Sequence, residues 1–492
     1  MSPHHHDLDS DDDEGVTPSF FLDMDSSLGV GGENMHIIIS GAGLAGLMLA
    51  NLFEIANISY EIVERCKDLN PYGKSTCCAV MSLNASILPV FEQLGLHEDL
   101  KKISYPASSF KFYNGNMRKL AEYVAEDDKE RDGYDRIVFS RTLLHELLLR
   151  KIPARKLHLG KKFKMLSQSD EGVAIKCTDK TEYYGDILIG ADGAHSGVRQ
   201  NLYWQMAQQG LLPEVDQRTL TKGYTCLLGV TESLDPVLFP GVEGPMSSGS
   251  VMISDNSPYT WSVFTIPENK ICWNVVIQLT AAESEEEQFR SSEWSVEASE
   301  KMLQEIADFP TPFGKLGTIV AATHRDMISR VFLEDILHET WNHERTILVG
   351  DSCHKLLPSA GQGAVTALQD AVVLANCLYE LPPHPTYEEI MVTLKDFRDQ
   401  RFQHVKTQYI ASQLSAKIQM GHTWSEKILR HIVFNYMPRW IQKRHLVRDM
   451  AYVPQVSFLP QIPKRGTGPV LPQKPSKRYQ EEKAKQQNAG LQ

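Results

Sequence analysis

The chain has 492 residues, of which 42% are hydrophobic and 23% charged, a composition typical of a soluble globular protein with two to three domains. Its net charge of −12 argues against nucleic acid as a partner, because neutralising phosphates requires a basic surface. The sequence contains neither an apolar run of about 18 residues that would span a bilayer nor a secretory signal, so we expect a cytoplasmic protein.

Neither the cysteines nor the first residues suggest chemistry. The eight cysteines are spread along the chain without C-x-x-C or Cys/His ligand spacing, so we predict reduced thiols and no metal site. Cys77 and Cys78 are adjacent, and we interpret them as two buried thiols. Residues 1–34 are acidic and lack hydrophobic periodicity, which predicts a disordered leader.

The stretch 35–64 has the pattern of a dinucleotide-binding unit. Met35–Ser40 is short, apolar and rich in β-branched residues, which predicts a buried strand. Three glycines follow at G-x-G-x-x-G spacing, apolar residues then recur at helical intervals over 44–55, and Ser59–Glu64 predicts a second strand. Strand, glycines, helix, strand and terminal acid in this order favour a dinucleotide site over an ordinary βαβ unit.

Each glycine of this motif has its own physical role. Gly41 makes a tight turn, Gly43 lets the backbone approach a pyrophosphate, and Gly46 lets the helix pack closely on the strand. The helix N-terminus presents free N–H groups to the phosphates. Glu64 is placed to accept hydrogen bonds from the hydroxyls of an adenosine ribose. A carboxylate suits an unphosphorylated ribose, so the motif predicts FAD or NAD rather than NADP.

The next part of the chain adds a helix, strands and a second group of polar residues. Ser82–Gly95 has apolar residues at helical spacing, and Arg136–Ser140 predicts a strand. Arg141 opens the helix after that strand, where a phosphate or ribityl contact is at least as well supported as a local cap. Asp186–Arg199, DILIGADGAHSGVR, begins as a buried strand, and its Asp192 is expected at the carboxyl edge of the sheet, where ligands bind.

The composition shifts between residues 200 and 340. Aromatic and β-branched segments separated by turns predict a mainly antiparallel sheet in this region, a second domain that covers the cofactor. A third buried strand, Thr346–Val349, follows and leads into Asp351. Gly361 and Gly363 then open a helix. These glycines let the backbone approach a flat ring, and the helix N-terminus favours negative charge on that ring.

The C-terminal part is predicted to be helical over 386–445. Its end is basic, with Arg439, Lys443 and Arg444, and Trp440 and Ile441 lie beside these charges. We favour a solvated helix over the core there, with peripheral docking on a membrane surface as the alternative. From Val453 the sequence is rich in proline and then basic, and we expect about the last 25 residues to be disordered.

Three of these segments together resemble the class A FAD-dependent aromatic hydroxylases, the p-hydroxybenzoate-hydroxylase-like flavoprotein monooxygenases. The segments are the glycine motif with Glu64, the stretch Asp186–Arg199, and Gly350–Asp370, GDSCHKLLPSAGQGAVTALQD. The likeness runs over roughly residues 35 to 400. The tail segment PQVSFLP is similar to that of fungal members that act on secondary metabolites.

The resemblance implies an α/β fold. Its parts are a Rossmann-like FAD-binding domain of the glutathione-reductase type, an inserted, mainly antiparallel substrate domain, and C-terminal helices. On this basis we divide the chain into a leader, an FAD-binding domain in two parts around the substrate domain, the helices, and a tail. The boundaries in chain order are 1–34, 35–200, 201–340, 341–385, 386–452 and 453–492.

The resemblance also assigns roles to single residues. It implies that Glu64 binds the adenosine ribose of FAD and that Arg141 contacts the ribityl or phosphate region. It places Asp192 in the segment that serves both the FAD pyrophosphate and the reductant. Asp351 is implied to bind the ribityl chain.

The same likeness implies that the backbone of Gly363 and Ala364 faces the isoalloxazine ring of FAD. Family members often carry a glycine-bearing stretch after the ribose acid, where this chain has Ser75–Cys78, so Cys78 is the candidate contact at that place. His354 lies inside the flavin motif, and we favour a structural or cofactor-orienting role over acid–base chemistry.

In the family, NAD(P)H visits a groove and reduces FAD, oxygen adds at flavin C4a, and the resulting hydroperoxide delivers oxygen to the substrate without a metal. We therefore expect an FAD-dependent monooxygenase that uses NAD(P)H and O₂ to hydroxylate or epoxidise an aromatic or apolar small molecule. Two alternatives stay open: a related flavin oxidoreductase that inserts no oxygen, and a non-catalytic flavin-binding regulatory protein. A flavin-dependent halogenase is disfavoured because the chain has no W-x-W-x-I-P segment.

Overall fold

The part of the chain that can be described is nearly continuous. Three segments with predictions lie outside it, so those predictions are not tested. They are the leader before residue 34, the Cys77–Cys78 pair, and the basic run around Trp440 except Ile441. The computed structural model describes residues 34–69, 80–280, 282–284, 296–438, 441, 447–448 and 450–489.

A six-stranded sheet forms the centre of the cofactor-side half of the molecule. Its strand order is β19-β20-β11-β1-β2-β7, and every pair is parallel except β19 with β20. Ile37, Ile38 and Ile39 of β1 have no exposed surface, as expected for a parallel strand covered on both faces. The α/β fold class is confirmed. The strands are β1 (His36–Ser40), β2 (Ser59–Glu64), β7 (Leu157–Leu159), β11 (Ile187–Gly190), β19 (Asn342–His343) and β20 (Thr346–Leu348).

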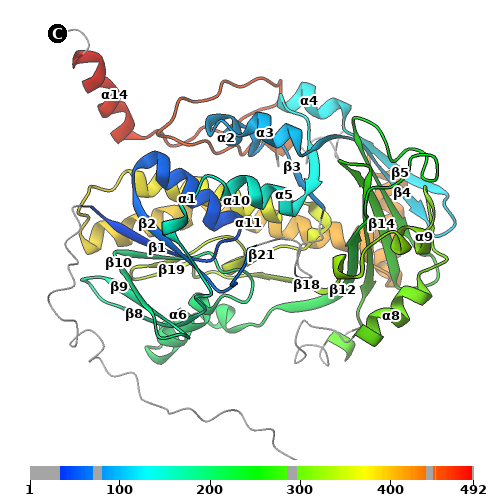
Figure 1. Ribbon diagram of the computed structural model, residues 1–492, viewed down its shortest axis with the longest axis horizontal. Helices are drawn as coiled ribbons and strands as arrows, with labels where there is room; N and C mark the ends of the chain where they lie inside the picture. Colours follow the sequence, from blue (N-terminus) through cyan, green and yellow to red (C-terminus); the bar gives the residue numbers. More distant parts are fainter. Residues whose placement is uncertain are drawn as a thin grey trace, which may run out of the picture.

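Two layers cover this sheet. Helices α1 (Leu44–Ala56) and α10 (Gly363–Tyr379) pack against each other on one side, and a small antiparallel sheet of β8, β9 and β10 lies on the other (Figure 1). The predicted apolar face of α10 extends around nearly the whole helix, because α1, α11 and the turn Gly350–Ser352 all pack against it. The small sheet consists of β8 (Phe163–Gln168), β9 (Val173–Cys177) and β10 (Glu182–Gly185).

A ten-stranded, mainly antiparallel sheet forms the other half of the molecule, on the right of Figure 1. Its order is β21-β18-β12-β15-β14-β13-β4-β6-β3, with β5 added to β4; the β13–β4 pair is parallel. The strands are β3 (Val80–Leu83), β4 (Tyr105–Asn114), β5 (Lys119–Val124), β6 (Ile137–Ser140), β12 (Thr221–Val230), β13 (Ser247–Ile253), β14 (Tyr259–Ile266), β15 (Lys270–Gln278), β18 (Ile328–Leu337) and β21 (His354–Lys355).

Four strands of this sheet come from residues 80–140, outside the 201–340 segment in which the sequence predicted it. The helix expected over Ser82–Gly95 is wrong for its first part. Val80–Leu83 is strand β3, and only Leu88–Gln93 is helical, with Pro89 in the first turn. The physical reason is non-local pairing: β3 pairs with β6, and β4 pairs with β13, far along the chain.

Short helices complete both halves of the fold. α5 begins at Arg141, as predicted, and buries Leu144, Leu147 and Leu148. The helices, in chain order, are α2 (Leu88–Gln93), α3 (His97–Lys102), α4 (Glu126–Asp132), α5 (Arg141–Leu149), α6 (Gly197–Gln208), α8 (Val296–Glu305) and α9 (Leu316–Ala321).

The predicted C-terminal helices are α11 (Tyr387–Met420) and α12 (Trp424–Tyr436). α11 contacts α10 on the cofactor side and β13, β14 and β15 on the sheet side, so this single long helix braces both halves. None of the helices in the described part of the chain combines the length and the apolar character needed to cross a bilayer.

The stretch from Val453 docks on the core, and the disorder expected for about the last 25 residues is wrong as far as residue 489. Val456 and Phe458 are buried, and the Phe458 ring stacks on Tyr379 at 4.5 Å. The chain then forms helix α14 (Lys477–Ala489), where the Arg478 guanidinium donates to the carbonyl of Tyr379. The sequence did not predict this order, because the segment is rich in proline and charge. Its few apolar residues dock singly on the core, without a helical or strand periodicity.

Candidate active site

Two of the three glycines of the first motif are required by close backbone contacts. Gly41 has φ of +108°, and a Cβ there would lie 2.5 Å from the carbonyl oxygen of Ala191. A Cβ on Gly46 would lie 2.1 Å from the carbonyl oxygen of Gly41. Gly43, by contrast, caps the N-terminus of α1, and a Cβ there would meet only the carbonyl oxygen of Ala191, 3.9 Å away. The motif therefore sets a tight turn with one exposed, side-chain-free position.

Glu64, at the end of β2, is held next to this turn. Its Oε2 accepts a hydrogen bond from the Ala42 N–H at 2.8 Å, and its Oε1 accepts one from the Cys66 N–H at 2.9 Å. Two backbone donors fix the plane of the carboxylate while leaving a lone pair on each oxygen. The structure thus orients Glu64 beside the glycine turn.

Asp192 follows β11 and meets the glycine turn from the neighbouring strand. Its Oδ2 accepts from the Val198 N–H at 3.2 Å, whereas its buried Oδ1 has no partner among the described residues. Burial raises the pKa of this carboxyl group. Ala191 and Gly193, on either side of it, line a cavity of about 540 Å³ between the two halves of the molecule.

Three charged side chains meet at this cavity. Asp351, just after β20, pairs with Lys355, and Arg141 reaches the same cavity from α5. Burial alone would raise the pKa of Asp351, but the charges of Lys355 and Arg141 lower it below its usual value. Asp351 is therefore an anion at neutral pH, set between two cations.

The N-terminus of α10 completes the cofactor-side wall. Gly363 and Ala364 line the cavity, and no atom lies within 4 Å of where a Gly363 Cβ would be. Gly361, in the turn before the helix, has a φ of +63°. The first N–H groups of α10 consequently lie bare at the wall, where the helix dipole favours negative charge.

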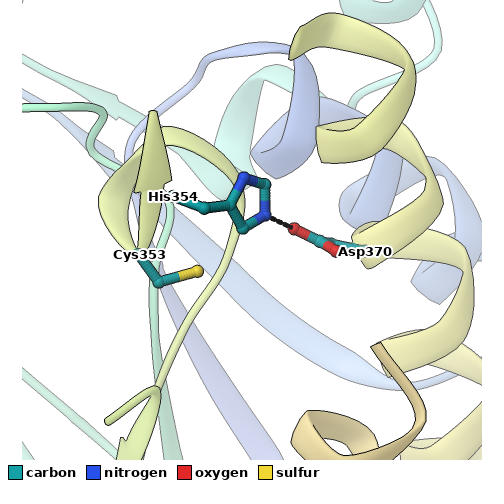
Figure 2. A group of neighbouring side chains, drawn as sticks. All are labelled: Cys353, His354 and Asp370. Carbon is teal, nitrogen blue, oxygen red and sulfur yellow. Dashed lines mark hydrogen bonds and ion pairs between the residues drawn. The ribbon is translucent and has the colours of Figure 1, made fainter. Parts of the chain in front are cut away.

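Behind this wall lies a buried network centred on Asp370 of α10 (Figure 2). Its Oδ2 accepts from the Gly350 N–H at 2.9 Å and lies 2.5 Å from His354 Nε2; its Oδ1 accepts from Arg401 Nε at 2.7 Å. Burial opposes the charged form, yet His354 and Arg401 lower the pKa of Asp370 to about 2. The network holds the turn that carries Asp351 and supports the structural role expected of His354.

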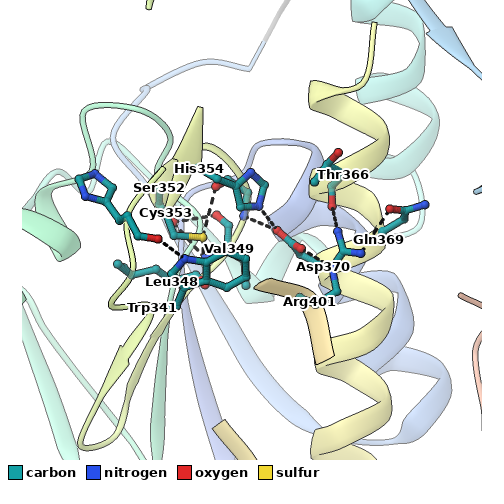
Figure 3. Close-up of polar contacts among 12 residues, drawn as sticks. Trp341, Leu348, Val349, Ser352, Cys353, His354, Thr366, Gln369, Asp370 and Arg401 are labelled. Carbon is teal, nitrogen blue, oxygen red and sulfur yellow. Dashed lines mark hydrogen bonds and ion pairs between the residues drawn. The ribbon is translucent and has the colours of Figure 1, made fainter. Parts of the chain in front are cut away.

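Arg401, from α11, ties this network to the first turns of α10 (Figure 3). Besides Asp370, its guanidinium donates to the Thr366 carbonyl at 3.1 Å and to Gln369 Oε1 at 3.4 Å. On the other side, Ser352 Oγ donates to the Gly190 carbonyl at 2.6 Å, joining the turn to β11. A continuous set of hydrogen bonds thus spans α11, α10, the Gly350 turn and the central sheet.

Cys353, His354 and Asp370 place possible metal-ligand atoms within 4.8 Å of one another. The Asp370 carboxylate is already shared by a guanidinium, a backbone N–H and an imidazole. The Cys353 thiol approaches the carbonyls of Leu348 and Gly350 at 3.5 Å, and burial raises its pKa well above the usual value. A thiol held protonated is a poor ligand, so we interpret the cluster as a hydrogen-bonded support.

The opposite wall of the cavity belongs to the ten-stranded sheet and is aromatic. Phe110 and Phe264 meet edge to face, with ring centroids 6.2 Å apart. A Cβ on Gly249 of β13 would lie 2.5 Å from Phe110 and 2.8 Å from Phe264, so glycine there lets both rings lie over the strand. The sheet-side lining residues are Val80, Met81, Ser82, Phe110, Phe112, Tyr123, Arg136, Val138, Val251 and Phe264.

The structure brings together most of the residues singled out in the sequence. Those that line the cavity are Gly43, Arg141, Asp351, Gly363 and Ala364. Gly41, Gly46, Glu64 and Asp192 shape or flank its cofactor-side wall, and Cys78 lies outside the described residues.

Sequence analysis missed Lys355, Arg136, the aromatic wall and the Asp370–Arg401 pair. Lys355 had a readable signal, because it lies four residues after Asp351 in a motif already singled out. The alternation of aromatic residues in FKFY, at 110–113, was a weaker signal for a strand with one face toward the ligand. Arg401, on a helix distant in sequence, had none.

Comparison with known proteins agrees with this geometry. The FAD binding domain family matches residues 34–222 and 243–405. The FAD-dependent monooxygenase ausM of Aspergillus calidoustus is 28% identical over 444 residues, covering 88% of this chain and 90% of its own length. The FAD-dependent monooxygenase penE of Penicillium thymicola is 27% identical over 442 residues, covering 87% and 88%.

Solved structures share the fold at low sequence identity. HpxO of Klebsiella pneumoniae, complexed with FAD and uric acid, has a TM-score of 0.68 and 19% identity, covering 85% of this chain and 97% of its own. The 2,6-dihydroxypyridine-3-hydroxylase from Arthrobacter nicotinovorans has a TM-score of 0.59 and 17% identity, covering 80% and 94%.

A Rossmann-like domain, a second sheet and a cavity between them define a two-part flavoprotein. The chain belongs to the FAD binding domain family, whose match covers most of its length. It is an FAD-dependent monooxygenase of the class A hydroxylase type, similar to enzymes of fungal secondary metabolism, and the resemblance inferred from three motifs is confirmed.

Proposed function

We propose that this monooxygenase takes electrons from NAD(P)H and inserts one atom of O₂ into an aromatic or apolar small molecule, by hydroxylation or epoxidation. The observation that carries the proposal is a cavity of about 540 Å³ whose two walls differ in chemistry. One wall consists of bare backbone, helix N-termini and charged side chains, and the other of aromatic rings. A cofactor and an apolar substrate therefore have separate surfaces that face each other.

The residues present fit FAD on three independent observations. Gly43 and Gly363 line the cavity without a side chain, and a Cβ on either would meet nothing closer than 3.9 Å, so backbone N–H groups at two helix N-termini are accessible. Asp192 keeps a buried oxygen without a partner among the described residues, ready to accept from a ligand hydroxyl or amide. Arg141 and Lys355 supply positive charge beside the cavity, as a pyrophosphate requires.

FAD bound there would supply the redox and oxygen chemistry, which no side chain provides. The chain's own residues would bind and orient it: Glu64 and Asp192 at the end near the glycine turn, and Asp351 with Arg141 and Lys355 further along. The α10 N-terminus at Gly363 would stabilise negative charge that develops on the ring. The aromatic wall would exclude water and hold the substrate carbon in place.

The sheet wall indicates the substrate's chemistry. Phe110, Phe112, Tyr123 and Phe264 offer ring faces and edges, which suit an aromatic or isoprenoid surface. Arg136 adds a cation at this wall, with its Nε buried 3.8 Å from Asp128. A largely apolar molecule with one acidic or hydroxyl group is the class that these residues favour.

NAD(P)H oxidation by the purified, FAD-loaded protein tests the proposal, with a panel of aromatic acids, polyketide phenols and prenylated compounds. A true substrate should accelerate oxidation while releasing little peroxide, and ¹⁸O from labelled O₂ should appear in the product. Acceleration with product but no ¹⁸O would instead favour an oxidoreductase that inserts no oxygen. No oxidation with either nucleotide, in protein that retains FAD, would overturn the proposal and favour the regulatory alternative.

A further inference from the structure

Helix α12 presents a stripe of large apolar side chains to solvent. Trp424, Ile428, Ile432 and Tyr436 follow one another at intervals of four residues, so they lie along one face. Their exposed fractions are 77%, 50%, 48% and 70%. Single exposed apolar residues are ordinary, whereas four in a row on one helix face mark an interaction surface.

The helix is fixed to the body of the protein, so this exposure is a property of an ordered element. Thr423 and Glu426 form a capping box at its N-terminus. The buried Arg430 donates to the carbonyls of Gly421 and Ile418, which closes the end of α11. Glu426 accepts from Gln278 of β15, which attaches the helix to the sheet.

The inner face of α12 reaches the cavity wall. The ring of Phe434 packs on Phe112 of β4, with centroids 5.3 Å apart, and Phe112 lines the cavity. The inner side of α12 thus contacts the aromatic wall of the cavity through Phe434, while the apolar stripe faces outward. A large apolar stripe on one face of a helix is normally covered by another surface.

The charges around the stripe fit a phospholipid surface. Lys427 is exposed beside it, and the one acid of α12, Glu426, is half-buried and accepts from Gln278, although the whole chain has a net charge of −12. Trp424 and Tyr436 stand at the two ends with isoleucines between them, which matches the preference of Trp and Tyr for the bilayer interface.

A second copy of the chain is a weaker fit. The stripe occupies one helix of 13 residues, about 20 Å long. A stable protein interface needs roughly 20 to 30 residues from each partner. An interfacial helix needs only its own apolar face, so the size of the stripe also favours a membrane.

We propose that α12 docks this enzyme on a phospholipid bilayer surface, with Trp424, Ile428, Ile432 and Tyr436 inserted among the headgroups and upper acyl chains. Docking brings the aromatic wall of the cavity, through Phe434 and Phe112, close to the lipid phase. Resting on the proposed function, this placement means that an apolar substrate dissolved in the bilayer enters from the α12 side.

Vesicle flotation with the FAD-loaded full chain tests the docking without any turnover. The probes are vesicles of phosphatidylcholine and vesicles with one fifth phosphatidylserine. The double substitution Trp424→Ser with Ile428→Ser should reduce the bound fraction at least about tenfold, since two large apolar side chains leave the interface. Trp204→Ser is the matched control, because Trp204 is also exposed, at 53%, but lies on α6.

Phosphatidylserine should increase binding of the unsubstituted chain through Lys427. Absence of binding to both vesicle types, or equal losses for the Trp204 and Trp424 variants, would overturn the proposal. So would sedimentation showing a dimer that the double variant alone dissociates, since the occupant would then be a second copy. FAD content and thermal stability should stay unchanged in all variants. NAD(P)H oxidation driven by a water-soluble effector should be equal in both variants, which separates failed docking from failed catalysis.

Discussion

The two walls of the cavity are built on different principles. The cofactor-side wall consists of backbone and glycine at strand ends, and its few side chains, such as Asp351 and Lys355, are fixed by their neighbours. The sheet-side wall consists of side chains from strands far apart in the sequence, such as Phe110 and Phe264. A constant ligand can be held by backbone geometry, whereas a variable substrate is better matched by side chains that can change without rebuilding the fold.

The largest expected effect of a single change is on the cofactor side. Asp370→Asn should lower the free energy of unfolding by about 3 to 5 kcal/mol, because it leaves the buried Arg401 guanidinium without its anion. FAD affinity should also fall, since Gly350 and His354 lose the carboxylate that positions the Asp351 turn. Chemical denaturation and FAD titration measure the two effects.

Asp396→Asn is the matched control, because Asp396 pairs with Lys474 at 2.7 Å on the partly exposed surface. It should change stability by about 0 to 1 kcal/mol. If Asp370→Asn were no worse than Asp396→Asn, the buried network would not support the cofactor wall, and the comparison of the two walls would fail.

The next largest effect is expected at the glycine turn. Gly46→Ala places a methyl group 2.1 Å from the Gly41 carbonyl, so backbone must move, at a cost near the upper end of the about 1 to 3 kcal/mol typical of overpacking. FAD should be lost with the turn geometry. Gly43→Ala meets nothing closer than 3.9 Å, so it should keep its melting temperature while binding FAD more weakly. Equal melting temperatures for the two variants would contradict this reading of the motif.

Acidification should weaken the support of the cofactor wall by a smaller amount. His404 stacks on Tyr452 with centroids 4.2 Å apart, and burial together with the Arg401 charge lowers its pKa to about 3. The unfolded chain binds this proton first, near pH 6.5, so stability falls as the pH drops below that value and levels off below about 3. Between about pH 7 and pH 5 the loss should be roughly 1 to 2 kcal/mol.

Denaturation of the unsubstituted chain and of His404→Gln across this pH range measures the slope. The variant should show a flatter profile. His422, on the sheet side, has its pKa lowered to about 4 by burial and should leave a residual slope. A parallel pair of profiles would show that His404 is already protonated in the folded state.

The smallest effect is expected at the sheet wall, and it concerns the KM for substrate and peroxide release instead of stability. Phe264→Leu should leave FAD affinity and stability nearly unchanged. It should raise the KM for substrate several-fold, which corresponds to about 1 kcal/mol, and increase peroxide release, because the ring no longer packs against the substrate. Steady-state kinetics with peroxide detection separates these outcomes. A loss of FAD affinity would mean that the walls are not independent.

The difference between the walls also explains what could be predicted from the sequence. Strand, glycines and acid at 35–64 are contiguous in the sequence, so the turn could be predicted. Asp351 and Gly363 could be predicted because they also lie in one contiguous motif. The aromatic wall depends on β4 pairing with β13 and on β3 pairing with β6. Such pairings follow from tertiary context, and local patterns at Ser82–Gly95 suggested helix instead.

The same limit applies to support that crosses between distant elements. Asp370 lies within a recognised motif, but its partner Arg401 is placed by the packing of α11 on α10. Val456 and Phe458 dock singly on the core, so periodicity gave no sign of them. Sequence patterns report local spacing, whereas these contacts are fixed by the assembled core.

The strand order has a consequence for how the protein is made. β1 lies between β2 and β11, and β11 pairs with β20, so a ribosome must synthesise the chain beyond Thr346 before the central sheet can close. Gln93 bonds to the backbone of Val456, which delays the last contacts further. High contact order of this kind slows folding and keeps strand edges open during synthesis. The cofactor-side wall is therefore complete only after most of the chain has been made, and FAD bound there would stabilise the folded protein by mass action.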